Sequence, residues 1–173
     1  MGYTTDFNGQ FKLDQPLTAD QRAYLTAFSG TRRFKRNAEV TSTFPDPVRE
    51  AVGLPVGDDG GYYVGDTENY GQNRKSDCAG YNNPPEGQPS LWCNWTPTED
   101  GTAIVWNEGE KFYHYTEWLK YIIEHFLQPW GRVLNGEVKW QGEDYEDRGI
   151  IYVKDNMVKA VDDEIHSPPP NWD

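Results

Sequence analysis

Residues Thr116–Val161 decide the fold and read TEWLKYIIEHFLQPWGRVLNGEVKWQGEDYEDRGIIYVKDNMVKAV. The first part predicts an amphipathic helix, because its large apolar side chains recur at 3.6-residue spacing and share one face. Thr116 is the expected N-cap, and Pro129 and Gly131 end the helix. The members of the apolar face are Trp118, Leu119, Ile122, Ile123 and Phe126.

Three strands follow this helix. Apolar residues alternate over residues 132–140, which predicts one uninterrupted strand and rejects a turn at Asn135-Gly136. Gly136 then marks a bulge or a close approach by another element. The next two strands, Gly149–Lys154 and Met157–Val161, are joined by a tight turn at Asp155-Asn156.

The chain before residue 116 supplies further strands. Alternation from Tyr3 onward predicts an N-terminal β-hairpin with a tight turn at Asn8-Gly9. A strand is also predicted at residues 91–95, where Leu91, Cys93 and Trp95 share one face, and a turn then leads to the strand Ala103–Trp106.

Two helices are predicted in the first third of the chain. Thr18 and Gln21 form a capping box at the start of a helix that ends at Gly30. A shorter helix begins at Asp46-Pro47, because Pro is favoured at the first helical position, and ends at Gly53.

Together these elements predict an α+β fold, an antiparallel sheet with helices packed mainly on one face. Residues 1–166 are expected to form a single domain, since a chain of 173 residues can bury a substantial core. Residues 167–173 form a Pro-rich C-terminal tail.

The net charge of −12 is unevenly distributed, with +1 on residues 1–50 and −13 on residues 51–173. Such a surface repels nucleic acid and favours basic partners, so direct nucleic-acid binding is not expected. No apolar run approaches the ~20 residues that span a bilayer. The N-terminus lacks the basic and apolar regions of a signal peptide, and we therefore expect a cytoplasmic protein without membrane contact.

Catalytic and metal-binding signatures are missing from the sequence. Cys78 and Cys93 are expected to be free thiols, and with three scattered histidines they do not supply the four ligands of a zinc site. No nucleophile elbow and no phosphate-binding glycine loop occurs. We expect no cofactor and assign no catalytic residue. This favours a non-enzymatic protein, while an enzyme built from scattered residues stays the alternative.

The only concentrated basic segment is Arg32–Arg36, with Phe34 at its centre. One interpretation is a phosphate or nucleic-acid contact in which Phe34 stacks on a base. The favoured interpretation is a solvated connection whose charges balance the acidic remainder of the chain.

The acidic connection, residues 141–148, holds four carboxylates within five residues. Several oxygens could converge there on Ca²⁺ or Mg²⁺, but the spacing does not match the EF-hand pattern. A solvated turn between two strands is therefore favoured over a metal site. Its carboxylates are Glu143, Asp144, Glu146 and Asp147.

Carboxylates in the last third could form a stripe that imitates the phosphates of DNA and occupies a basic, nucleic-acid-binding surface of another protein. The leading hypothesis is thus an acidic, non-enzymatic protein-interaction module, which would act as an inhibitor of the surface that it occupies. The partner-binding residues would be Glu137, Glu143, Asp144, Glu146, Asp147, Asp155, Asp162, Asp163 and Glu164.

Segment 57–89 lacks regular periodicity and is rich in turn-forming residues, although Tyr62–Val64 can form a short strand. The alternative function is a small-molecule-binding domain or enzyme with an aromatic-lined pocket under this loop. The pocket would be lined by Tyr62, Tyr63, Tyr81 and Trp92, which otherwise anchor the loop on the core.

The segments SLWCNWTPTEDGTAIVW, FYHYTEWLKYIIEHF and WGRVLNGEVKWQGEDYEDRGIIYV resemble a group of small uncharacterised proteins from bacteria and their phages. The resemblance extends from the N-terminal strand region to about Val161. It brings no established activity and therefore assigns no catalytic residue. It implies an accessory protein or a protein of a mobile element.

Overall fold

The computed structural model describes residues 2–162 and 172. Two compact units are present: the sheet unit, residues 1–16 with 94–173, and the loop unit, Leu17–Cys93. The predicted α+β class with an antiparallel sheet is confirmed. The assignment of residues 1–166 to a single domain stays a prediction. It is tested by calorimetry, where a single domain unfolds in one cooperative transition.

The sheet unit is built on a six-stranded antiparallel sheet, counted over the described residues, in the order β4-β5-β1-β6-β7-β8. The last three strands follow each other along the chain, and β1 pairs with β5 on one side and with β6 on the other. The strands are β1 (Thr5–Leu13), β4 (Trp95–Pro97), β5 (Ala103–Trp106), β6 (Leu134–Gly142), β7 (Arg148–Lys154) and β8 (Met157–Asp162).

The hairpin predicted at Asn8-Gly9 is wrong. Strand β1 runs through these residues without a turn, because its whole length pairs with β6. The two glycines, Gly9 and Gly136, have φ of 118° and 142°. A Cβ on either would lie 2.9 Å from a carbonyl oxygen of the opposite strand. Both Asn-Gly pairs thus mark a close backbone approach in one ribbon, and the uninterrupted strand predicted over residues 132–140 is confirmed.

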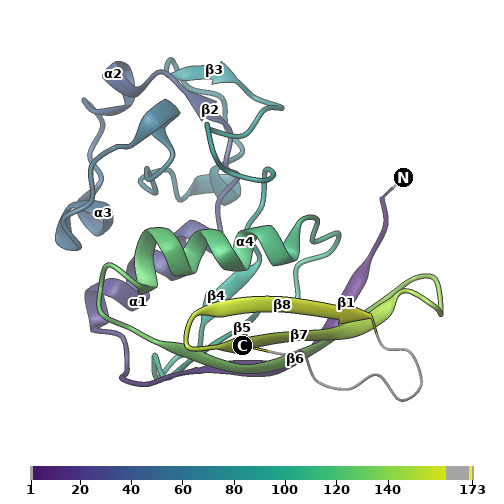
Figure 1. The fold of residues 1–173 in the computed structure, drawn as a ribbon. Helices are drawn as coiled ribbons and strands as arrows, with labels where there is room; N and C mark the ends of the chain where they lie inside the picture. The colour runs from purple at the N-terminus through teal and green to yellow at the C-terminus, as the bar shows by residue number, and fades with distance from the viewer. Residues whose placement is uncertain (1, 163–171, 173) are drawn as a thin grey trace. The chain divides into compact units, whose positions relative to one another are not determined.

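Helix α4 (Tyr115–Ile122) continues into a π-helical turn, η3 (Ile123–Leu127), and lies over one face of the sheet (Figure 1). Its predicted apolar residues are all buried. The helix begins earlier than predicted, because His114 takes the N-cap position with φ of 57° and Thr116 already belongs to the first turn.

The space between α4 and the sheet is filled mainly by aromatic rings. Phe7 of β1 makes edge-to-face contacts with Trp95, Trp106, Phe112 and Tyr115, with centroids 5.0–5.7 Å apart. Such offset contacts add to the hydrophobic gain of burying large rings.

Strand β4 is shorter than predicted. Residues 91–93 lie outside the sheet, because the Leu91 carbonyl accepts a hydrogen bond from the Arg33 amide of the loop unit at 2.7 Å. Other predicted turns are confirmed, among them Asp155-Asn156 between β7 and β8, where both residues have positive φ.

The loop unit contains short elements only, apart from α1, whose predicted capping box is present with Thr18 as the N-cap and Gly30 as the C-cap. The predicted strand at Tyr62–Val64 is absent from the described structure. The elements are α1 (Ala19–Ser29), β2 (Lys35–Arg36), α2 (Ala38–Thr41), α3 (Pro47–Ala51), η1 (Asp58–Gly60), η2 (Glu68–Gly71) and β3 (Cys78–Gly80).

None of the helices in the described part of the chain is both long enough and apolar enough to cross a membrane.

Candidate functional site

The β6–β7 turn is held against the N-terminal segment by its own carboxylates. The Tyr3 hydroxyl donates to Asp147 Oδ2 at 2.6 Å, and the Trp140 indole donates to Asp147 Oδ1 at 3.1 Å. The backbone amide of Thr4 donates to Glu143 Oε1 at 2.7 Å. The hydrogen bond to Asp147 is the main cause that raises the pKa of Tyr3. The turn therefore presents its charges in a fixed geometry.

Further carboxylates gather at the same end of the sheet. Asp162 pairs with Gly149 at the start of β7, and Glu117 lies in the first turn of α4. Burial raises the pKa of Tyr115 to about 12, and the negative charges of Asp147, Asp162 and Glu117 add to this effect. Three chain segments thus contribute to one acidic end, which we define as Glu117, Glu143, Asp144, Glu146, Asp147 and Asp162.

The acidic end is not arranged as a metal site. Among the described residues, no group of three or more His, Cys, Asp or Glu side chains is placed to hold a metal ion. Glu143 and Asp147 accept hydrogen bonds from the protein instead, while Asp144 and Glu146 point to solvent as exposed residues. This geometry agrees with the solvated turn favoured by the sequence.

The nine predicted partner-binding residues are only partly brought together. Five of them, including Asp162, belong to the acidic end. Glu137 lies within β6 on the other face of the sheet from α4, and Asp155 lies in the β7–β8 turn at the opposite end. Asp163 and Glu164 fall outside the described residues. Glu117, absent from the predicted set, joins them because the helix begins at that end of the sheet.

The four aromatic residues of the predicted ligand pocket instead make contacts within the loop unit. The carbonyl of Tyr62 accepts a hydrogen bond from the Tyr24 hydroxyl at 2.8 Å. Tyr63 is buried, which raises its pKa. The Tyr81 hydroxyl donates to the Gln72 carbonyl at 2.6 Å, and Trp92 is half-buried. The Tyr81 side chain thus contacts its own unit, while the ligand pocket at these four residues stays a prediction.

The basic segment Arg32–Arg36 differs most from expectation, because three of its five side chains are buried, while Lys35 is exposed and Arg32 is half-buried. Arg33, Phe34 and Arg36 are 1%, 1% and 3% exposed. The Arg36 guanidinium lies between the rings of Phe34 and Tyr63, 4.0 and 4.6 Å from their centroids. This places a cation in the centre of the loop unit, where it needs an anionic partner.

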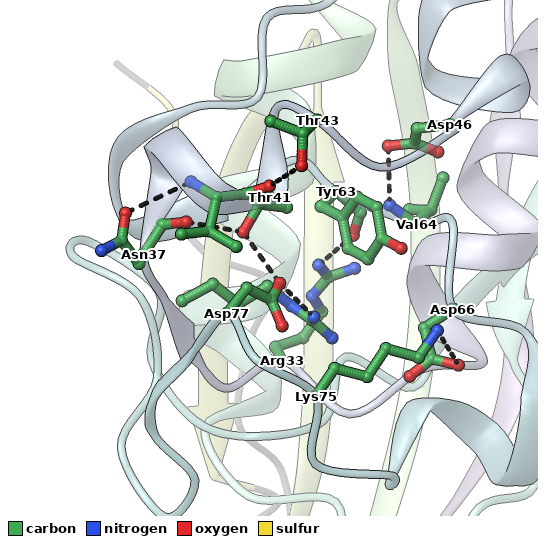
Figure 2. Close-up of polar contacts among 12 residues, drawn as sticks. Arg33, Asn37, Thr41, Thr43, Asp46, Tyr63, Val64, Asp66, Lys75 and Asp77 are labelled. Carbon is green, nitrogen blue, oxygen red and sulfur yellow. Dashed lines mark hydrogen bonds and ion pairs between the residues drawn. The ribbon is translucent and has the colours of Figure 1, made fainter.

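Buried aspartates supply that partner (Figure 2). Asp77 is fully buried and accepts from Arg36 Nη1 and from the Thr41 hydroxyl, both at 2.8 Å. Asp46 accepts from Arg49 Nε at 2.8 Å and from the Val64 amide at 3.1 Å. Asp66, also buried, lies 3.6 Å from the ammonium group of Lys75. We call these side chains the buried ionic network: Arg36, Asp46, Arg49, Asp66, Lys75 and Asp77.

This network could not be predicted from the sequence, since a basic segment and three separate aspartates resemble ordinary surface residues. Each of its carboxylates lies within ion-pair distance of a cation of the same unit. It ties residues 33–36 to the turn at residue 77 and ties α3 to residue 64.

The structure describes two of the three histidines and both cysteines. His114 is exposed and its Nδ1 lies 3.6 Å from Glu117. The His125 ring stacks on Tyr121 with centroids 4.0 Å apart, and His166 lies outside the described residues. Neither Cys78 nor Cys93 forms a disulfide in the described part of the chain.

Comparison of the chain with protein-family models, with curated proteins and with solved structures finds no match.

Proposed function

We propose that the protein is a non-enzymatic interaction module whose acidic end binds a basic surface of a partner protein. The observation that carries this proposal is the convergence of carboxylates from three segments, the β6–β7 turn, the end of β8 and the first turn of α4, at one end of the sheet unit. A basic groove that normally binds nucleic acid is the kind of surface that such an end would occupy and inhibit.

The fixed geometry of the turn favours specific binding. Hydrogen bonds from Tyr3, Thr4 and Trp140 hold the turn before a partner arrives, so less conformational entropy is lost on association. Tyr145 projects from the same turn and is 73% exposed. Exposed tyrosines are frequent energetic centres of interfaces, and this one offers apolar area among the carboxylates.

The charge of this end also defines the class of partner. Its six carboxylates repel phosphate groups and attract Lys and Arg, and this attraction speeds the encounter with a basic protein at low ionic strength. Direct binding of nucleic acid at this end is correspondingly disfavoured.

The test is affinity capture from a lysate of the source organism at low salt, using the wild-type protein and the triple variant Glu143→Gln, Asp144→Asn, Glu146→Gln. A matched control, Glu50→Gln, Glu86→Gln, Glu99→Gln, removes the same charge from exposed positions elsewhere. The captured partner is then purified and its Kd is measured against salt concentration.

We expect the triple variant to bind about 10- to 100-fold more weakly at low salt and to lose most of the salt dependence, since each neutralised rim charge removes up to ~1 kcal/mol. The control variant keeps the wild-type affinity within about threefold. Equal capture by both variants, or a partner whose affinity does not respond to salt, would contradict the proposal.

A further inference from the structure

The face of the sheet that points away from α4 has a charge opposite to that of the acidic end. Strand register and alternation place fifteen described residues on this outer face, from β1, β6, β7 and β8. Two of them are acidic, Asp6 and Glu137. Five are basic: Lys12, Lys139, Arg148, Lys154 and Lys159. A net positive sheet face on a chain of net charge −12 is not explained by a general need for solubility.

A cavity of about 320 Å³ opens on this face and crosses β1, β6 and β7. We call it the outer trough. The backbone of Phe7, Trp140 and Gly149 runs along its middle, because these residues pair across the three strands. The Phe7 and Trp140 side chains lie on the core side of the sheet, and Gly149 has no side chain. Side chains of the flanking rows form the walls, and the cavity is lined by Asp6, Asn8, Lys139, Gln141 and Arg148 besides the middle row.

Lys139 and Arg148 stand on opposite sides of the middle row. Among the described residues, neither has a carboxylate within 4.0 Å of its charged nitrogens. The Arg148 guanidinium stacks on the Tyr145 ring, 4.6 Å from its centroid, which limits its conformations. The Gln141 side-chain amide donates to carbonyls of the β6–β7 turn, among them that of Asp144 at 3.1 Å. These hydrogen bonds hold Gln141 in the trough wall, next to its strand partner Arg148. Two cations without a close carboxylate therefore line one cavity, and the Tyr145 ring restrains one of them, Arg148.

The opposite end of the trough has a different chemistry. Asp6 and Asn8 of β1 lie one strand away from Lys139 and two strands away from Arg148, which corresponds to about 10 Å between β1 and β7. A carboxylate and an amide at that distance accept hydrogen bonds from hydroxyl groups. The trough is thus bipolar, with anion-binding groups on β6 and β7 and hydrogen-bond acceptors on β1.

We infer that the outer trough binds a sugar phosphate. Its phosphate group lies between Arg148 and Lys139, where the planar guanidinium donates two parallel hydrogen bonds and the ammonium adds a point charge. Its hydroxyl groups donate to Asp6 and Asn8. A cavity of about 320 Å³ is near the lower limit of small-molecule sites, which suits a ligand of this size. A longer polyanion would have to run past the acidic end, which lies directly beyond Gln141.

The test is a titration of the ¹⁵N-labelled protein with ribose 5-phosphate, followed by backbone amide shifts. Ribose and inorganic phosphate are the comparison ligands, because each carries one half of the proposed recognition. The variants are Arg148→Gln and Lys139→Gln, and the matched control is Lys154→Gln, an exposed outer-face cation that does not line the trough. The dispersion of each spectrum reports whether the variant is folded.

We expect saturable shifts in residues 6–8, 139–141 and 148–149 with ribose 5-phosphate, at least tenfold weaker binding of inorganic phosphate, and none of ribose. Arg148→Gln and Lys139→Gln each weaken binding about tenfold or more, whereas Lys154→Gln binds within about twofold of wild type. Absence of saturable shifts up to about 10 mM ligand would overturn the inference. So would equal affinity for inorganic phosphate, which would identify an adventitious ion only, or unchanged binding by folded Lys139→Gln.

Discussion

The sheet unit and the loop unit satisfy their polar groups in different ways. In the sheet unit, strand pairing satisfies the backbone, and the space under α4 is filled by apolar and aromatic side chains. In the loop unit, regular elements are short, and charged side chains enter the interior, with Arg36 and Asp77 nearly or fully buried.

This difference follows from the hydrogen-bond requirement of a buried backbone. A segment without a strand partner or a helical turn leaves its amides and carbonyls without partners, and side chains then replace the missing groups. Arg33 donates to the Tyr63 carbonyl, Gln88 donates to the Gly61 carbonyl at 2.7 Å, and Asp46 accepts from the Val64 amide. The loop unit therefore depends on paired charges where the sheet unit depends on apolar area.

The largest effect is expected from Asp77→Ala. Removal of the Asp77 carboxylate leaves the buried Arg36 guanidinium without its anion, so the unfolding free energy should fall by about 3–5 kcal/mol. The Thr41 hydroxyl keeps the Asn37 carbonyl as an acceptor. Urea denaturation measures the change. Lys35→Met is the matched control, because it breaks an exposed pair with Asp59 and should change stability by less than ~1 kcal/mol. If Asp77→Ala lowered the unfolding free energy as little as Lys35→Met does, the claim that the loop unit depends on buried ion pairs would be wrong.

Gly136→Ala tests the sheet unit in the same experiment. The added Cβ meets the Gln10 carbonyl oxygen at 2.9 Å, and φ of 142° is unfavourable for alanine, so a loss of about 1–3 kcal/mol is expected. Gly87→Ala is the control, because its φ is also positive, 83°, but no atom lies within 4 Å of the added Cβ. An equal loss in both variants would show that backbone conformation, and not the close strand approach, sets the effect.

Thr18→Ala removes one half of the capping box of α1 and should destabilise the protein by about 1 kcal/mol. Thr26→Ala, an exposed change within the same helix, serves as the comparison and should be neutral or slightly stabilising. Thermal unfolding followed by circular dichroism resolves the two. Equal melting temperatures of the two variants would mean that the cap contributes nothing.

The smallest effect concerns pH. Burial lowers the pKa of His125 below 6.5, although the neighbouring Glu124 opposes this shift. Between the lowered folded pKa and about 6.5 the unfolded chain binds more protons than the folded protein, so stability rises with pH through this window and is fully present above it. Melting temperature should therefore fall on acidification from about pH 7.5 to 5.5, and His125→Gln should flatten part of that slope. If the melting temperatures of wild type and His125→Gln fell equally on acidification, the dependence would not come from His125.

The sequence predicted the sheet unit better than the loop unit, and the reason is the period of its apolar residues. Alternation located β5–β8, and the 3.6-residue spacing located α4. The prediction from sequence failed at Asn8-Gly9, because a tight turn and a close approach of two strands both favour glycine with positive φ. Only the opposite strand, more than a hundred residues away, distinguishes the two cases.

The loop unit could not be predicted in the same way. Burial of an arginine depends on its partner and not on its neighbours in sequence, and the partner of Arg36 is Asp77, at a sequence separation of 41. The acidic end was predicted in part, since four of its six carboxylates lie within the five residues 143–147 and Asp162 was also in the predicted set. Glu117 was missed, because its position depends on where the helix begins relative to the sheet.

A double-mutant cycle on Arg36 and Asp77 tests the central difference between the units most directly. Unfolding free energies are measured for wild type, Arg36→Met, Asp77→Leu and the double variant, with the same cycle on Lys35 and Asp59 as the exposed reference. We predict a coupling energy of about 2–3 kcal/mol for the buried pair, and less than ~1 kcal/mol for the exposed pair. Additive single changes at Arg36 and Asp77 would contradict the conclusion that paired charges hold the loop unit together.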